Sequence, residues 1–253
     1  MDRFAPYGGV HLAVVLLSVA FWYAVIRRAR RVRGTRAERR LRLVYGGAIL
    51  AVCGGWMFYG LTPGAWDVRE SIPLHLCDLA WMAAAWSVLS GGDPARLQHQ
   101  LTFYWTLGFS TLGYLTPTVT EGPASASFLA FFASHWLVVG AGFLNYHGFG
   151  WRPTKRGLLQ AVVASTLLYA VATAVNLALD TNYCYSGRST PVHPTPVDLF
   201  GPWPLRILWI WAVSMGVLLL LSLKSRPGAA LAGIRSGASG GAGPGGRPGA
   251  QTP

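Results

Sequence analysis

Charged residues are scarce in this chain. Only 12% of its 253 residues are charged, whereas 52% are hydrophobic. Soluble domains carry about 25% charged residues, so this composition excludes an ordinary soluble domain of this size. Nine acidic residues stand against 21 basic ones, giving a net charge of +12. The basic residues lie between apolar runs and not among exposed aromatics on a soluble fold, which argues against a nucleic-acid partner. An integral membrane protein is predicted.

Cysteine is equally scarce, and no repeat of fixed period is visible. Cys53, Cys77 and Cys184 form no CxxC pair and no even framework, which argues against a disulfide scaffold and a zinc ribbon. The missing repeat argues against an inverted-repeat transporter. A metal site made from His75, Cys77 and His135 ranks low, because residues 75 and 77 project to nearly opposite sides of a helix. We expect neither a metal nor a cofactor.

Long apolar runs are what the sequence has in abundance. Seven stretches have roughly the 20 residues needed to cross a bilayer. They are residues 10–28, 43–62, 71–90, 98–117, 127–147, 157–179 and 203–223. The start, MDRFAPYGG, lacks the basic region of a signal peptide, so the first helix is expected to remain as an anchor. The predicted fold is an all-α polytopic membrane bundle of seven transmembrane helices.

The distribution of basic residues predicts the orientation. With the amino terminus outside, the inner side carries nine arginines between positions 27 and 42, together with Arg96, Arg152, Lys155, Arg156, Lys224, Arg226, Arg235 and Arg247. Only Arg3, Arg69, Arg188 and Arg206 then lie outside. Basic residues are enriched in cytoplasmic loops, so the amino terminus is predicted outside and the carboxyl terminus in the cytoplasm.

The last part of the chain has a different composition. Residues 224–253 are rich in Gly, Ala and Pro and contain no aromatic residue. Such a segment buries too little apolar surface to fold. The predicted organisation is therefore a transmembrane domain over residues 1–223, followed by a disordered cytoplasmic tail over residues 224–253, in a multi-pass protein of the cell membrane, most simply a bacterial plasma membrane.

Polar residues inside the apolar segments are the functional candidates. Polar groups are expensive in a bilayer and usually face a bundle interior or a cavity. In the predicted topology the candidates gather in the outer leaflet. They are His11, His75, Cys77, Asp78, His135, Asn176, Asp180, Asn182 and Tyr183.

Cys77 and His135 are predicted to lie at similar depth. Cys77 is about six residues below the outer start of segment 71–90, roughly 9 Å, and His135 is about eight residues below that of segment 127–147, roughly 12 Å. A thiol in apolar surroundings is inert unless a base stabilises its thiolate, and a histidine at matching depth supplies one. A nucleophile and base pair is one hypothesis for these residues, and packing is the other.

Helical spacing separates the other members of "SIPLHLCDLAW", residues 71–81. His75 and Asp78 are three residues apart and share a face, whereas Cys77 is about 100° from Asp78. Asp78 is therefore expected to partner His75 within the bundle. His11 is either a third member of the cluster or an interfacial residue.

Several short motifs resemble a known family. "IPLHLCDLA", "FFASHW", "YGGVHL" and "LDTNYCYSG" with "DLFGPWP" are similar to those of the YwaF-like family of bacterial integral membrane proteins. That family is related to a eukaryotic transmembrane acyltransferase that remodels ether phospholipids. The resemblance runs from about His11 to Trp209 and implies that Cys77 and His135 are the catalytic pair. Cys184 departs from the more usual Met after Asn-Tyr.

Two classes of function follow. The first is a lipid acyltransferase or acyl hydrolase, in which Cys77 attacks a phospholipid acyl ester, His135 takes its proton, and a lysophospholipid or water resolves the thioester. Asn176 and Asn182 are candidate oxyanion donors. The second is a non-catalytic carrier or ligand-binding bundle, with His11, His75, Asp78 and His135 as a polar relay and Cys77 as packing. Membrane lipids are the expected partners in the first class.

Overall fold

The computed structural model describes residues 3–93, 96–188 and 196–224, and this part of the chain folds into helices and loops without a strand. The predicted all-α class is confirmed. The α-helices are α1 (Gly9–Val32), α2 (Arg36–Ile49), α3 (Gly55–Gly60), α4 (Leu76–Ser90), α5 (Leu97–Leu101), α6 (Thr111–Leu115), α7 (Ala126–Phe143), α8 (Lys155–Leu179) and α9 (Leu205–Lys224). Three π-helical segments, η1 (Leu50–Gly54), η2 (Thr102–Ser110) and η3 (Leu144–Gly148), continue α2, α5 and α7, and the single turns η4 (Tyr183–Tyr185) and η5 (Pro196–Phe200) follow α8.

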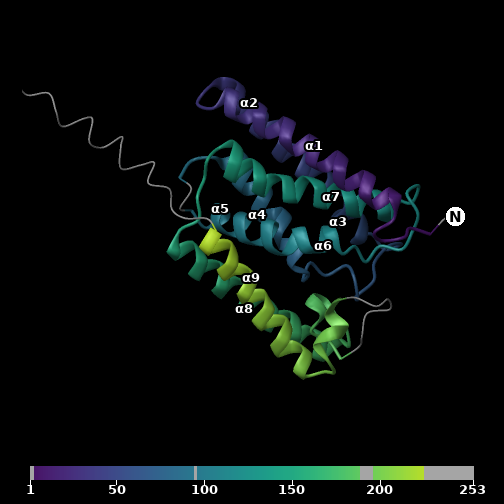
Figure 1. Ribbon diagram of the computed structural model, residues 1–253. Helices are drawn as coiled ribbons and strands as arrows, with labels where there is room; N and C mark the ends of the chain where they lie inside the picture. Colours follow the sequence, from purple (N-terminus) through teal and green to yellow (C-terminus); the bar gives the residue numbers. More distant parts are fainter. Residues whose placement is uncertain (1–2, 94–95, 189–195, 225–253) are drawn as a thin grey trace, which may run out of the picture.

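The helices form a bundle around an apolar core. Figure 1 shows α1 and α2 along one side and α8 and α9 along the opposite side, with α4, α5, α6 and α7 between them. Five helical stretches are long and apolar enough to cross a membrane: Gly9–Val32, Arg36–Gly60, Ala126–Gly148, Lys155–Leu179 and Leu205–Lys224. Half of the apolar window of Ala126–Gly148 is buried, against 11% of that of Leu205–Lys224. The outer helices therefore present apolar surface to the surroundings, as lipid-facing helices do.

The helix predicted over residues 71–90 starts later than expected, and this part of the prediction is wrong. Helix α4 begins at Leu76 and has 15 residues, a rise of about 22 Å. Pro73 disfavours a helical conformation in the residue before it, and His75 is extended at φ −74° and ψ 144°. Cys77 therefore lies in the first turn of its helix and not six residues into it.

The central rod, residues 97–115, joins α5, η2 and α6 without a break and is buried along most of η2. The chain leaves the helix at Thr116, which adopts φ −122° and ψ 63° immediately before Pro117. Helices α4 and α7 both pack along the rod, and they also contact each other. The rod is thus the surface that both candidate catalytic helices share. Of the predicted tail, only Lys224 lies among the described residues.

A glycine on α7 permits the close approach of two aromatic side chains. A Cβ atom on Gly140 would overlap the Tyr45 hydroxyl and the Trp22 ring nitrogen. Neither ring can move freely, because Tyr45 Oη donates to the Leu137 carbonyl at 3.0 Å and Trp22 Nε1 donates to the Trp136 carbonyl at 2.9 Å. Contact between backbone and aromatic rings here needs a residue without a side chain.

We expect Gly140→Ala to destabilise the protein by about 1–3 kcal/mol, because overpacking would push α1 and α2 away from α7. Thermal unfolding in detergent measures the effect. Gly216→Ala is the matched control, since a Cβ atom on Gly216 meets nothing within 4 Å. Equal melting temperatures for the two variants would contradict this packing.

Candidate functional site

His75 and Asp78 form the start of α4. His75 is the residue before the helix, and its backbone N–H donates to Asp78 Oδ2 at 3.0 Å. An acidic side chain at the third helical position that accepts from the preceding backbone N–H satisfies a donor that the helix cannot. Asp78 therefore bonds to His75, but to its backbone N–H and not to its imidazole ring. The prediction placed both residues within the helix, whereas His75 lies just before it.

We expect Asp78→Ala to lower stability by about 1–3 kcal/mol, because it leaves a buried N–H without an acceptor. Asp78→Asn retains a carbonyl oxygen at the same place and should lose less. Thermal melting in detergent distinguishes the two variants. Asp180→Asn serves as the control, since Asp180 is exposed. A melting temperature unchanged by Asp78→Ala would show that the cap contributes nothing.

The loop after α8 is organised by Asn176. Its amide donates to the Tyr183 carbonyl at 2.8 Å and to Ser186 Oγ at 2.9 Å, and its carbonyl oxygen accepts from Thr181 Oγ1 at 2.8 Å and Tyr183 N–H at 2.7 Å. All four bonding positions of the side chain are therefore occupied within the loop. Asn176 can act as an oxyanion donor only by giving up one of these bonds.

Two other candidates also shape this loop. Asp180 adopts the left-handed conformation, φ 52° and ψ 46°, and its N–H donates to the Asn176 carbonyl, which ends the helix. The side-chain oxygen Oδ1 of Asn182 accepts from Gly187 N–H at 2.9 Å. Asp180 is exposed and Asn182 is half-buried. Both residues hold the loop in shape around its next members.

Tyr183 and Cys184 fasten this loop to the segment before α4. The Tyr183 hydroxyl donates to the Val68 carbonyl at 2.6 Å and accepts from Ile72 N–H at 3.1 Å. Its ring packs edge-on against His75, with 5.2 Å between the ring centres. Cys184 Sγ donates to the Leu74 carbonyl at 3.1 Å. These contacts bring residues more than 100 positions apart together beside Cys77.

The His75 ring has a defined proton position in its neutral form. Cys184 N–H donates to His75 Nδ1 at 3.4 Å, so Nε2 carries the ring proton. Tyr185 also faces this ring, with 6.2 Å between centres. Burial raises the pKa of the Cys184 thiol and of the Tyr185 phenol to about 12 each. Both groups are therefore neutral donors at physiological pH.

His135 presents the opposite tautomer. Its Nδ1 lies 2.9 Å from the Phe131 carbonyl, and a carbonyl oxygen only accepts, so Nδ1 carries the proton and Nε2 holds a free electron pair. The ring stacks on Phe131, with 4.3 Å between centres, which fixes its orientation. Nε2 lies 3.5 Å from where a Cβ atom on Gly113 would stand. The nitrogen able to accept a proton therefore points at the central rod.

Cys77 approaches the same rod. Its thiol neighbours the Ser110 hydroxyl, and Ser110 and Gly113 are three residues apart, on one face of the helix. The Cys77 and His135 contacts on the rod are thus separated by a rise of about 4.5 Å. Cys77 is half-buried, and Asp78 interacts electrostatically with it and with Cys53 and Cys184. The rod brings a thiol and a proton acceptor to neighbouring turns.

His11 stands apart from this pair. Its Nδ1 accepts from Tyr7 N–H at 3.1 Å and its Nε2 donates to the Tyr114 carbonyl at 3.2 Å. The ring also packs against Phe4 and Phe132, at 5.9 and 5.8 Å between centres. Both ring nitrogens are used, so His11 fastens the start of α1 to the end of the rod, next to Gly113.

A second polar cluster, which sequence reasoning missed, lies at the other end of α4. Ser87 Oγ donates to His99 Nδ1 at 2.8 Å and accepts from Asn145 Nδ2 at 2.6 Å, and His99 Nε2 donates to the Gly91 carbonyl at 3.0 Å. Ser87, His99 and Asn145 come from three separate segments of the chain. The spacing of apolar residues along one helix does not show that polar residues of different helices will meet. The cluster joins α4, α5 and η3.

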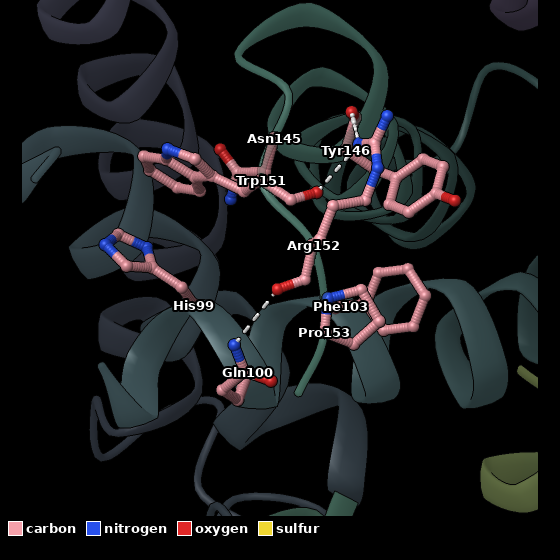
Figure 2. Close-up of a pocket in the computed structure, with 8 residues that line it drawn as sticks. All are labelled: His99, Gln100, Phe103, Asn145, Tyr146, Trp151, Arg152 and Pro153. Atoms are coloured by element: carbon pink, nitrogen blue, oxygen red, sulfur yellow. Dashed lines mark hydrogen bonds between the residues drawn. The ribbon is translucent and has the colours of Figure 1, made fainter. Parts of the chain in front are cut away.

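A small hollow of about 10 Å³ adjoins this second cluster, about the space that one water molecule needs. Figure 2 shows Trp151 over His99, with Arg152 extending toward Tyr146. The lining residues are His99, Gln100, Phe103, Asn145, Tyr146, Trp151, Arg152 and Pro153. None of the residues predicted to form the site lines it. Among the described residues, no three His, Cys, Asp or Glu side chains converge as metal ligands.

A comparison with family models places the chain. The model of the TMEM164 family matches residues 6–223, a range that contains every candidate from His11 to Tyr183 and nearly all of α9. Comparison with curated proteins and with solved structures found no match.

Proposed function

The chain belongs to the TMEM164 family of transmembrane proteins, and from this premise we propose that it is a lipid acyltransferase or acyl hydrolase with Cys77 as nucleophile and His135 as general base. The observation that carries the proposal is the shared face of the central rod. The Cys77 thiol neighbours Ser110, and the unprotonated nitrogen of His135 points at Gly113, one turn away.

Cys77 and His135 have the complementary roles that such a reaction requires, a thiol that must lose its proton and a base that can accept it. A buried thiol is inert without a base, and His135 is held in the tautomer that offers an electron pair toward the rod. A backbone carbonyl that accepts from the other ring nitrogen fixes this tautomer, which is how protein bases are commonly oriented. A nucleophile must meet its substrate, and Cys77 is half-buried.

The reaction proceeds in two steps. His135 Nε2 takes the thiol proton, the sulfur attacks the ester carbonyl of a phospholipid, and the C–S bond forms as the C–O bond breaks. The departing lysophospholipid oxygen takes the proton from His135. A second lysophospholipid, or water, then gives its proton to His135 and attacks the thioester carbonyl. The C–S bond breaks as the new C–O bond forms, and the Cys77 sulfur takes the proton from His135 and returns to the thiol.

We further propose the seven-span topology derived from the distribution of basic residues, with the amino terminus outside and the Cys77 end of the bundle in the outer leaflet of a bacterial plasma membrane. Helix α4 and the central rod are then the two spans enclosed by the other five. The resemblance to YwaF-like proteins and to the ether-phospholipid acyltransferase supports phospholipids as the substrate class.

The test is to trap the intermediate. Purified protein in detergent is given a phospholipid with a labelled acyl chain, quenched, and digested. The expected result is a hydroxylamine-sensitive acyl adduct on the Cys77 peptide, with labelled lysolipid acceptor appearing afterwards. Absence of adduct and of turnover across phospholipids with ester and ether chains would overturn the proposal.

The carrier alternative has less support. A relay requires hydrogen bonds between its members, but His11 uses both ring nitrogens at Tyr7 and Tyr114, and Asp78 binds the His75 backbone. Lipid-dependent solute uptake by the Cys77→Ala variant in vesicles, without any acyl transfer by the unmodified protein, is the result that would restore it.

A further inference from the structure

Ser110 differs from the other helical hydroxyl residues in what its hydroxyl contacts. Thr102, Thr106 and Thr173 donate to the carbonyl four residues earlier, at 2.6 to 2.7 Å, which is the usual arrangement inside a helix. Ser110 is fully buried, and its hydroxyl makes no ordinary hydrogen bond among the described residues. A buried hydroxyl without a partner is costly and calls for an explanation.

The π-helical turn explains why the usual acceptor is lost. The carbonyl four residues before Ser110 belongs to Thr106, and in η2 this oxygen accepts from the Thr111 backbone N–H and from Thr111 Oγ1 at 3.0 Å. A carbonyl oxygen has two lone pairs, so both are occupied. The Ser110 hydroxyl therefore has no acceptor within its own helix. The group next to it is the Cys77 thiol.

We propose that Ser110 is a positioning residue for Cys77: its hydroxyl donates to the sulfur once the thiol proton has left and holds the thiolate against the rod, one turn from His135. This rests on the proposed function, in which Cys77 is the nucleophile. No bond forms or breaks at Ser110, because the proton of Cys77 goes to His135 and that of Ser110 stays on its oxygen. Hydrogen bonds to a charged acceptor are about twice as strong as neutral ones.

Titratable groups of the neighbouring elements lie near Cys77 or near its contact on the rod. Asp78 and His75 lie on or beside its own helix, Cys184 and Tyr185 come from the loop after α8, and His135 comes from α7. Asp78 disfavours a thiolate, so the nearby donors must offset its charge. Ser110 is the hydrogen-bond donor to Cys77 that comes from the rod.

The experiment follows the alkylation of Cys77 by iodoacetamide across pH, in detergent, with the Cys77 peptide quantified by mass spectrometry. Ser110→Ala should move the midpoint of the profile upward by about one pH unit and slow alkylation near neutral pH by roughly tenfold. Ser110→Thr keeps the hydroxyl and should restore the profile. Thr106→Val is the matched control, because it removes a buried hydroxyl of the same rod that is bonded to Thr102.

Each result decides the question. An unchanged profile for Ser110→Ala, or an equal shift for Thr106→Val, would overturn the inference. So would unfolding of Ser110→Ala, since a hydroxyl that serves only Cys77 should leave the melting temperature within a few degrees. Lipid turnover by Cys77→Ala would instead remove the proposed function, whereas an unchanged alkylation profile with intact Cys77 chemistry would remove only Ser110.

Discussion

Cys77→Ala is expected to abolish both the acyl adduct and lipid turnover, because no other described thiol lies beside Ser110 on the central rod. Cys77→Ser should be severely impaired, since a hydroxyl is far harder to deprotonate than a thiol. The measurement is the release and transfer of a labelled acyl chain by purified protein in detergent.

Cys53→Ala is the matched control for the nucleophile. Cys53 is buried in η1 within the main hydrophobic core, so its substitution should cost some stability and leave turnover nearly unchanged. Cys184→Ala is a poorer control, because the Cys184 thiol donates to the Leu74 carbonyl beside His75. Full turnover by Cys77→Ala would remove the nucleophile from the proposal.

His135→Ala is expected to slow formation of the acyl adduct by roughly 10²–10⁴-fold, the usual contribution of a general base. Binding of the lipid should change much less, because a base acts in the transition state and not in the bound substrate. Single-turnover acylation and lipid affinity, measured separately on the same preparation, give the two quantities.

His147→Ala is the control for this histidine. His147 lies on η3, the continuation of the same helix, and its side chain is exposed. Its substitution should leave the rate of acylation unchanged. If His135→Ala lowered lipid affinity and acylation by the same factor, His135 would be a binding residue and not the base.

Hydropathy was sufficient to find the helices, because the apolar length needed to cross a bilayer is a property of composition. It could not place the start of α4, where Pro73 and the Asp78 cap act over single residues. Nor could it tell that Asp78 binds the backbone of His75, since helical spacing applies only to residues inside a helix. The assumed helix over residues 71–75 does not form.

The candidate site was predictable only in part. Residue chemistry and the expected depths directed attention to Cys77 and His135. The depth expected for Cys77 was wrong, because α4 begins at Leu76 and Cys77 lies in its first turn. The structure adds the rod that both side chains approach. The role of Ser110 could not be found from the sequence. Its hydroxyl is free to approach Cys77 only because Thr111 occupies the Thr106 carbonyl, and apolar periodicity does not distinguish an α-helical from a π-helical turn. The His99 cluster was missed for a related reason, since its bonds join Ser87, His99 and Asn145 across separate helices.

The wide turn in η2 makes the site sensitive to the length of the rod. Each residue of a helix turns the chain by roughly 100°, so loss of one residue between Thr102 and Ser110 that left the hydrogen-bond pattern of the rod unchanged would rotate everything after it relative to α4 and α7. Ser110 would then turn away from Cys77, and Gly113 would turn away from His135 at the same time. Every side chain of the site would still be present in the chain. Homologues that keep Cys77 and His135 but differ by one residue in this stretch are therefore expected to have lost the alignment of the pair.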